Sequence, residues 1–183
     1  MMKDIKLSQA TETDIAQINE WKNIYADKFT SIEQFVLEGG MIPNLDMLIA
    51  IHESDKTDSK LTHSLVAKTR DNEVVGLLLT KMYNIKSETP DLKINQIAIN
   101  PKYQHSGYGY QILTELFENP KKYLSKTPYM VFCNIDNENL ASMFLFLKLG
   151  FDLQTPNRTT LFSAESTLPK ILDRINQNKK SLS

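Results

Sequence analysis

The spacing of hydrophobic residues changes several times along the chain, and each change predicts a different element. Residues 5–7 alternate apolar with polar side chains, which predicts a short first strand. Thr11 and Asp14 then form a pair typical of a helix N-terminus, and apolar residues recur at helical spacing over 15–25. Residues 31–40 repeat the helix-start signal and end in two glycines, so we expect a second, shorter helix there.

The middle of the chain contains short apolar runs separated by polar segments. Residues 47–51, 65–67 and 74–79 each predict a strand. The last two runs flank residues 71–73, a polar triplet typical of a hairpin turn. Residues 52–60 contain no apolar side chain, so we expect a solvated loop there.

From residue 94 onward, strands and helices alternate. The predicted elements are a strand over 94–99, a glycine turn at 107–109, a helix ending at 119, a strand over 129–135, a helix over 137–149, a strand over 157–162 and a helix from 166. This order predicts an α/β (α+β) fold, a mixed central sheet flanked by helices on both faces. We expect the early strands to be antiparallel, and the strands around the two later helices to include parallel neighbours.

Composition restricts the class of protein. The 183 residues are 41% hydrophobic and 23% charged, which is ordinary for a globular protein. The formal net charge of -1 provides no basic field for nucleic acid, so we expect no nucleic-acid partner. The length predicts one domain over residues 1–165 with a C-terminal helical tail over residues 166–183.

The compartment is indicated by the single cysteine and by the absence of long apolar runs in the sequence. Cys133 alone excludes an intramolecular disulfide and suits a reducing compartment. The polar N-terminal residues do not resemble a signal peptide, and no apolar run approaches the roughly 20 residues that span a bilayer. We therefore expect a cytoplasmic protein without membrane contact.

The most informative segment is the turn that follows the strand over 94–99. Gly107 and Gly109 lie where this strand gives way to a helix, and the first amides of a helix have no partner within it. These amides and the helix dipole favour a phosphate or pyrophosphate. The spacing matches neither a P-loop, which needs a lysine after the second glycine, nor a dinucleotide-binding turn, which needs a third glycine. A tight turn without a ligand stays the alternative.

Two segments resemble the GCN5-related N-acetyltransferase (GNAT) family. Residues 104–109, Gln-His-Ser-Gly-Tyr-Gly, are similar to the family signature Gln/Arg-x-x-Gly-x-Gly/Ala, and residues 97–103 resemble the strand and lead-in before it. Residues 139–151 resemble a later helix of the family, with the pattern Asn-x-x-Ala/Ser and then Leu-Tyr-x-Lys-x-Gly-Phe. The matches occur in the family's order, and with the hairpin over 65–79 the resemblance extends over roughly residues 3–163.

The resemblance implies acetyl-CoA as the acetyl donor, and it implies splayed fourth and fifth strands that leave a cleft for it. Main-chain amides of the turn would hold the pyrophosphate, while the fourth strand and a later asparagine would contact the pantetheine arm. The implied binding residues are Ile97, Ala98, Ile99, Gln104, His105, Ser106, Gly107, Tyr108, Gly109, Tyr110 and Asn139.

Both positions that usually carry acid–base chemistry in the family hold other residues here. Phe146 occupies the place of the tyrosine that protonates the leaving thiolate, and Gln96 lies near the place of a strand carboxylate. Neither side chain can donate or accept a proton at neutral pH. Tyr108, Tyr103 and Tyr83 are candidate substitutes, and transfer by positioning of the two substrates alone is the alternative.

We therefore expect an acetyl-CoA-dependent N-acetyltransferase in which a primary amine, of a small molecule or a peptide, attacks the thioester directly. A CoA-binding module of the same fold with weak or no catalysis is the alternative. The C-terminal tail allows a homodimer. We expect no metal, because His52, His63 and Cys133 lack the spacing of metal ligands. These two histidines and His105 are interpreted as exposed and inert.

The remaining candidate residues have structural interpretations. Phe144, Phe146 and Phe151 are interpreted as core, with Phe146 also able to line the cleft. Cys133 on its predicted strand is interpreted as a small buried apolar residue. Residues 136–138 are interpreted as the cap of the following helix.

Overall fold

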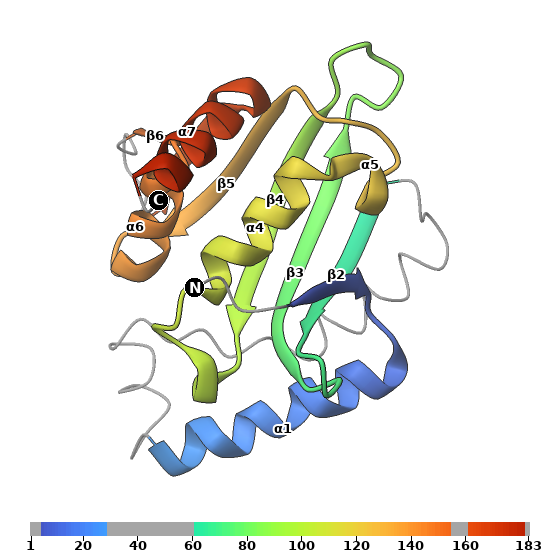
Figure 1. Cartoon of the computed structure of the whole chain (residues 1–183), viewed down its shortest axis with the longest axis vertical. Helices are drawn as coiled ribbons and strands as arrows, with labels where there is room; N and C mark the ends of the chain where they lie inside the picture. Colours follow the sequence, from blue (N-terminus) through green and yellow to red (C-terminus); the bar gives the residue numbers. More distant parts are fainter. Residues whose placement is uncertain (1–4, 29–60, 155–160, 182–183) are drawn as a thin grey trace.

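A computed structural model describes residues 5–28, 61–154 and 161–181 of the chain. It contains a seven-stranded sheet in the order β1-β2-β3-β4-β5-β7-β6 (Figure 1). The strands are β1 (Lys6–Gln9), β2 (Thr62–Lys68), β3 (Val74–Tyr83), β4 (Asp91–Ile99), β5 (Met130–Asp136), β6 (Asp152–Gln154) and β7 (Leu161–Thr167). The helices are α1 (Glu12–Lys28), the 3-10 helix η1 (Pro101–Tyr103), α4 (Tyr108–Glu118), α5 (Pro120–Tyr123), α6 (Leu140–Lys148) and α7 (Leu168–Lys180). In these ranges, no helix combines the length and apolar character needed to cross a membrane.

The strand directions agree with the prediction. β1 to β4 form an antiparallel ladder, β4 and β5 are parallel, and β7 is antiparallel to both β5 and β6. The hairpin turn between β2 and β3 lies at residues 71–73 as predicted, with Asn72 in the left-handed region at φ 61°. A short polar residue tolerates that region better than most, which explains its place in the turn.

Alternate residues of the central strands enter two separate hydrophobic cores, because side chains along a strand point to opposite faces in turn. Val66, Leu77 and Ala98 pack with Ile18 and Trp21 of α1. The core on the other face joins the sheet to α4 and α7, and its members include Leu65, Ala67, Leu78, Ile112, Leu116, Ile171 and Ile175. Helices therefore cover both faces of the mixed sheet, which confirms the predicted fold class.

A β-bulge interrupts β4 near its middle. Two successive residues of β3 pair with Gln96 and Ile94, which leaves Asn95 as an extra residue on β4. The bulge exchanges the two faces of the strand. Ile94 and Ala98 are four positions apart, yet Ile94 lies in the core on the side of α4 and Ala98 in the core on the side of α1. Bulges also bend a strand, and β4 pairs with β5 only as far as Ile94, which lies opposite Cys133.

The structure corrects the prediction at the ends of several elements. β7 continues to Thr167, into the segment expected to be the helical tail. β6 and α5 have no counterpart in the prediction, because elements of three or four residues carry too little periodicity to be recognised. The predictions made for residues 31–40, 47–51 and 52–60 lie outside the described residues.

The cap of α6 is also corrected. The side-chain oxygen of Asn139 accepts a hydrogen bond from the Ser142 amide at 3.0 Å, so Asn139 and not residues 136–138 caps this helix. Within the preceding turn, Asp136 instead accepts a hydrogen bond from the Glu138 amide at 2.9 Å. The cap residue is the same asparagine that the sequence implied for acetyl-CoA binding.

Two side chains lie in surroundings that the sequence did not predict. Phe144 is 68% exposed on the outer face of α6, whereas Phe146 and Phe151 are buried as expected. Positions two apart on a helix are about 200° apart around its axis, so Phe144 and Phe146 point in nearly opposite directions. His63 is buried in β2, where burial lowers the pKa of its imidazole.

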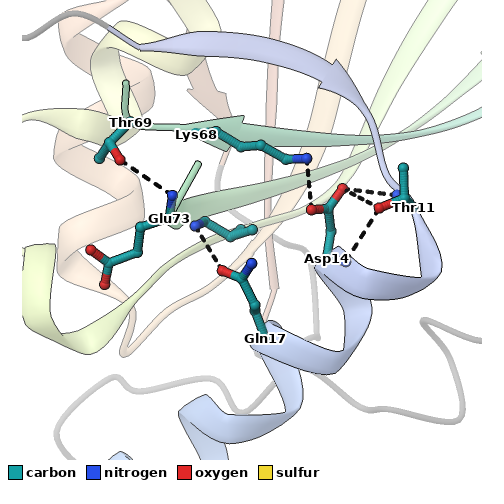
Figure 2. A network of polar contacts seen from close by, with 7 residues as sticks. Thr11, Asp14, Gln17, Lys68, Thr69 and Glu73 are labelled. Atoms are coloured by element: carbon teal, nitrogen blue, oxygen red, sulfur yellow. Dashed lines mark hydrogen bonds and ion pairs between the residues drawn. The ribbon is translucent and has the colours of Figure 1, made fainter. Parts of the chain in front are cut away.

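Polar contacts hold α1 to the β2–β3 hairpin (Figure 2). Thr11 and Asp14 form the predicted capping pair, in which the Thr11 amide donates to the Asp14 carboxylate at 2.9 Å. The same carboxylate lies 2.7 Å from the Lys68 ammonium group on β2. One helical turn further on, Gln17 accepts a hydrogen bond from the Val74 amide at 3.1 Å. The hairpin is therefore fixed to α1 at both of its strands.

We expect the Asp14 carboxylate to contribute stability that depends on pH. Burial raises its pKa, but hydrogen bonds from Lys68 and Thr11 outweigh burial, so the pKa is lowered from 3.8. This stability is present above the unfolded pKa and is lost as the pH falls through the folded pKa. Asp14→Asn should lower the free energy of unfolding at pH 7 by about 1–3 kcal/mol, and the variant should lose less stability than wild type between pH 7 and pH 3.

Urea unfolding at both pH values measures these differences. Glu20→Gln, an exposed position on the same helix, is the matched control and should be nearly neutral. An equal loss for both variants at pH 7 would contradict the role assigned to Asp14.

Candidate functional site

A cleft opens between β4 and β5 where the two strands separate. The ladder between them joins residues 91–94 to residues 130–133 and stops there. Beyond it, residues of both strands and of α6 surround an open cleft. Its lining consists of Ile94, Asn95, Gln96, Ile97, Cys133, Asn134, Ile135, Asp136, Asn139, Ser142 and Phe146. The predicted separation of the fourth and fifth strands is therefore present in the structure.

The chain leaves β4 in a fixed direction toward the glycine turn. Asn100 holds the end of the strand, since its amide donates to the Val75 carbonyl at 3.0 Å and its side chain donates to the Val74 carbonyl at 3.2 Å. Gln104 then folds back and donates from Nε2 to the Ile99 carbonyl at 3.3 Å. These bonds connect the start of the turn to both β3 and β4.

Two residues of the turn have a backbone conformation that also occurs in anion-binding loops. His105 and Gly107 lie in the left-handed region, at φ 58° and 82°, and such residues in a turn can direct neighbouring amides toward one side. Across the described residues, the amides of Gly107 and Gly109 donate no hydrogen bond. A Cβ built on Gly107 would meet no atom within 4 Å. The turn therefore faces open space with donors available at the positive end of α4.

Gly109 has a different structural role from Gly107. A Cβ at Gly109 would lie 3.2 Å from the Leu145 side chain of α6 and 3.9 Å from Ile97 of β4. The missing side chain lets α6 approach the first turn of α4 closely. Gly107 thus serves the backbone conformation, while Gly109 serves the packing that brings α6 beside the cleft.

The structure brings only part of the predicted site to the cleft. Ile97 and Asn139 line it. The side-chain oxygen of Asn139 caps α6, which leaves its side-chain nitrogen, Nδ2, available to a ligand. Ala98 is buried on the face covered by α1. Residues 104–110 follow the end of β4 as the turn and the start of α4, outside the lining of the cleft.

The tyrosine candidates for acid–base chemistry lie elsewhere, since no tyrosine is among the described lining residues. Tyr108 is buried and packs edge-on against Tyr103, with ring centroids 5.7 Å apart. Tyr83 lies at the opposite end of β3 from the glycine turn. Gln96 and Phe146 do line the cleft, and both are buried. The cleft therefore presents an amide and an aromatic ring at the two positions where the resemblance implies proton transfer.

Cys133 is the single thiol of the chain and lines the cleft from β5. Burial raises the pKa of this thiol to about 12. The thiolate is the reactive form of cysteine, so Cys133 is not a nucleophile at neutral pH. The structure confirms the prediction of a small buried residue.

We expect Cys133 to stay unmodified when the folded protein is mixed with Ellman's reagent at pH 8, because both burial and the raised pKa suppress the thiolate. One thiol per chain should react after unfolding in guanidinium chloride. The absorbance of the released aryl thiolate measures both states. A rapid stoichiometric reaction of the folded protein would contradict this expectation.

Two lining residues, Asn95 and Asn134, were not singled out by the sequence, and Asp136 was interpreted as a helix cap and not as part of a cleft. Asn95 is the extra residue of the bulge, and the three-residue step between Ile94 and Ile97 is a sequence signal for it. The part of the chain that the structure describes contains no cluster of three or more histidine, cysteine, aspartate or glutamate side chains able to hold a metal ion.

The structure combines a glycine turn at the start of a helix with a cleft between two diverging parallel strands. This combination suits an extended, phosphate-bearing ligand. The model of the acetyltransferase (GNAT) family matches residues 18–151 of the chain. The protein therefore belongs to this family. The match confirms both the family and the acetyltransferase class expected from the sequence.

Solved structures share the fold at low identity. The acetyltransferase from Thermus thermophilus has a TM-score of 0.66 at 17% identity, covering 91% of this chain and 97% of that one. The PaiA N-acetyltransferase from Thermoplasma acidophilum, in complex with coenzyme A, has a TM-score of 0.64 at 18% identity, covering 90% and 99%. The spermidine N-acetyltransferase from Vibrio cholerae, in complex with CoA and spermine, has a TM-score of 0.64 at 16% identity, covering 92% and 98%. No curated protein matches the chain.

Proposed function

We propose that the protein transfers the acetyl group of acetyl-CoA to a primary amine, which attacks the thioester directly. The observation that carries this proposal is the cleft between β4 and β5, which opens near a turn with available amides. This arrangement suits a ligand with a diphosphate at one end and an extended arm at the other. The presence of CoA in the T. acidophilum and V. cholerae structures supports the same cosubstrate.

The residues of the turn and the cleft fit acetyl-CoA. Main-chain amides of residues 104–110 would hold the diphosphate at the positive end of α4. The edge of β4 near Ile97, which no longer pairs with β5, would pair with the pantetheine arm as an added strand does. The side-chain nitrogen of Asn139, at the start of α6, would contact the pantetheine arm.

The described cleft contributes positioning more than acid–base catalysis. A main-chain amide of β4 near Ile97 would stabilise the thioester oxygen as negative charge develops there. Gln96 can orient a water molecule but cannot remove a proton from the amine, and Phe146 cannot protonate the thiolate. Holding the two substrates in reactive geometry can supply much of the rate without such groups.

Calorimetry with acetyl-CoA, followed by a thiol-release assay with a panel of primary amines, tests the proposal. The panel includes spermidine, because one similar structure is a spermidine N-acetyltransferase, and peptides with free N-termini. We expect acetyl-CoA to bind and at least one amine to release CoA thiol. Binding without release for any amine favours the alternative, a CoA-binding module. No binding at millimolar acetyl-CoA would contradict the proposal.

A further inference from the structure

The glycine turn is linked to the β2–β3 hairpin through Tyr103, the last residue before the turn. The hydroxyl group of Tyr103 donates a hydrogen bond to the Glu73 carboxylate in the hairpin. We propose that Glu73 and Tyr103 are positioning residues that hold the turn in its anion-binding conformation. This inference rests on the proposed function, because acetyl-CoA is the ligand whose diphosphate the turn would hold.

Hydrogen bonds of its main chain hold Glu73 in place. Its amide donates to the Thr69 hydroxyl at 3.3 Å and its carbonyl accepts from the Thr69 amide at 3.0 Å, which closes the hairpin turn. The next residue, Val74, donates to Gln17 of α1 and accepts from Asn100 at the end of β4. Figure 2 shows the Glu73 carboxylate pointing away from both Thr69 and Gln17. That carboxylate is therefore available to accept the hydrogen bond from the Tyr103 hydroxyl group.

Tyr103 also connects the two ends of the turn. Its ring packs edge-on against the ring of Tyr108, with centroids 5.7 Å apart and planes at 81°. Tyr108 is the first residue of α4 and is buried. Only residues 104–107 lie between the two tyrosines, so the ring contact joins the residue before the turn to the residue after it.

The conformation of the turn requires such support. His105 carries a side chain yet lies at φ 58°, a left-handed region that is unfavourable for a residue with a Cβ. Strained residues persist where the surrounding structure fixes them. The hydrogen bond between Tyr103 and Glu73 is called the brace below. A turn that is fixed before its ligand binds loses less conformational entropy on binding, so loss of the brace should weaken binding. The hydrogen bond to Glu73 raises the pKa of Tyr103, which keeps its hydroxyl protonated as a donor.

The chain offers a matched control at the other end of α4. The Tyr123 hydroxyl donates to Glu115 at 2.6 Å, so it too makes a tyrosine–glutamate hydrogen bond. Neither Tyr123 nor Glu115 lines the cleft or belongs to the turn. Tyr123→Phe therefore removes the same kind of bond without touching the brace.

Calorimetric Kd values for acetyl-CoA test the brace. Tyr103→Phe and Glu73→Ala should each raise the Kd about three- to tenfold, the range of one hydrogen bond. Glu73→Gln should raise it less, because glutamine keeps an acceptor oxygen. Both Glu73 variants remove the charge, so their difference isolates the acceptor. Tyr123→Phe should bind like wild type. Wild-type Kd values for Tyr103→Phe and Glu73→Ala would overturn the inference, as would equal weakening by Tyr123→Phe.

Hydrogen exchange of the free protein separates failure of this inference from failure of the proposed function. Amides of residues 104–110 should exchange faster in Tyr103→Phe than in wild type and Tyr123→Phe. If wild type fails to bind acetyl-CoA but Tyr103→Phe still shows this faster exchange, the proposed function fails and the brace stands as a feature of the turn alone. Unchanged exchange in Tyr103→Phe overturns the brace whether or not acetyl-CoA binds.

Discussion

Phe146→Tyr should raise kcat by at least about tenfold with little change in the KM for acetyl-CoA, given that a placed general acid contributes 10²–10⁴-fold. Phe146 lines the cleft and is otherwise enclosed by the core, where its ring packs edge-on against Phe151 at 5.0 Å between centroids. The substitution adds one hydroxyl group to a ring already in place. That hydroxyl would supply the proton that the leaving thiolate lacks in the wild-type cleft. Steady-state thiol release at saturating acetyl-CoA measures the change.

Phe144→Tyr is the matched control for this experiment. Phe144 lies on the same helix but is exposed on its outer face, away from the cleft. The control should leave kcat at the wild-type value. Equal kcat values for Phe146→Tyr, Phe144→Tyr and wild type, with acetyl-CoA binding intact, would contradict the view that the cleft lacks a proton donor at Phe146.

Ile171→Ala should lower the free energy of unfolding by about 2–5 kcal/mol, the usual cost of emptying a fully buried site. Ile171 and Ile175 of α7 are 0% exposed and belong to the core shared by α4 and the sheet. α7 is also tied to the rest of the molecule by Asn178, which donates to the Tyr110 hydroxyl and to the Lys148 carbonyl, each at 3.1 Å. The midpoint of urea unfolding, at constant m-value, measures the loss.

This experiment also tests the division of the chain into residues 1–165 and a tail over residues 166–183. Asn176→Ala, at an exposed position of α7, is the control and should be nearly neutral. A loss below about 1 kcal/mol for Ile171→Ala, well short of the usual range for a buried isoleucine, would indicate an appendage that contributes little to the core. A full loss would make α7 part of one cooperative unit with the residues before it.

The sequence predicted elements best where periodicity or capping chemistry was local. Thr11 and Asp14 identified the start of α1 because their side chains bond to each other's backbone and hydroxyl groups. The turn at residues 104–109 was recognisable because glycine spacing reflects backbone conformation directly, and Gly107 does lie at φ 82°. The resemblance to a known family then added the cleft, which no periodicity in the sequence indicated.

Features that depend on tertiary packing were beyond the sequence. The outward direction of Phe144 depends on which face of α6 meets the sheet, and an apolar helix such as α6 does not reveal that face. The contact between Glu73 and Tyr103 joins residues 30 positions apart, with no local pattern that pairs them. The bulge at Asn95 did leave a signal in the three-residue step from Ile94 to Ile97, but its effect on β5 emerges only in the folded sheet.

The main-chain amides at the start of α4 should bind the diphosphate of acetyl-CoA. Titration of ¹⁵N-labelled protein with acetyl-CoA, followed by amide NMR spectra, tests it directly, because the chain has only six glycines and their signals are readily distinguished. Gly107 and Gly109 should show saturable shifts that are among the largest in the spectrum, while Gly76, whose position is enclosed by Ile112 and Ile99, should shift little. Saturable binding that leaves Gly107 and Gly109 unshifted, or no binding at all, would contradict the account.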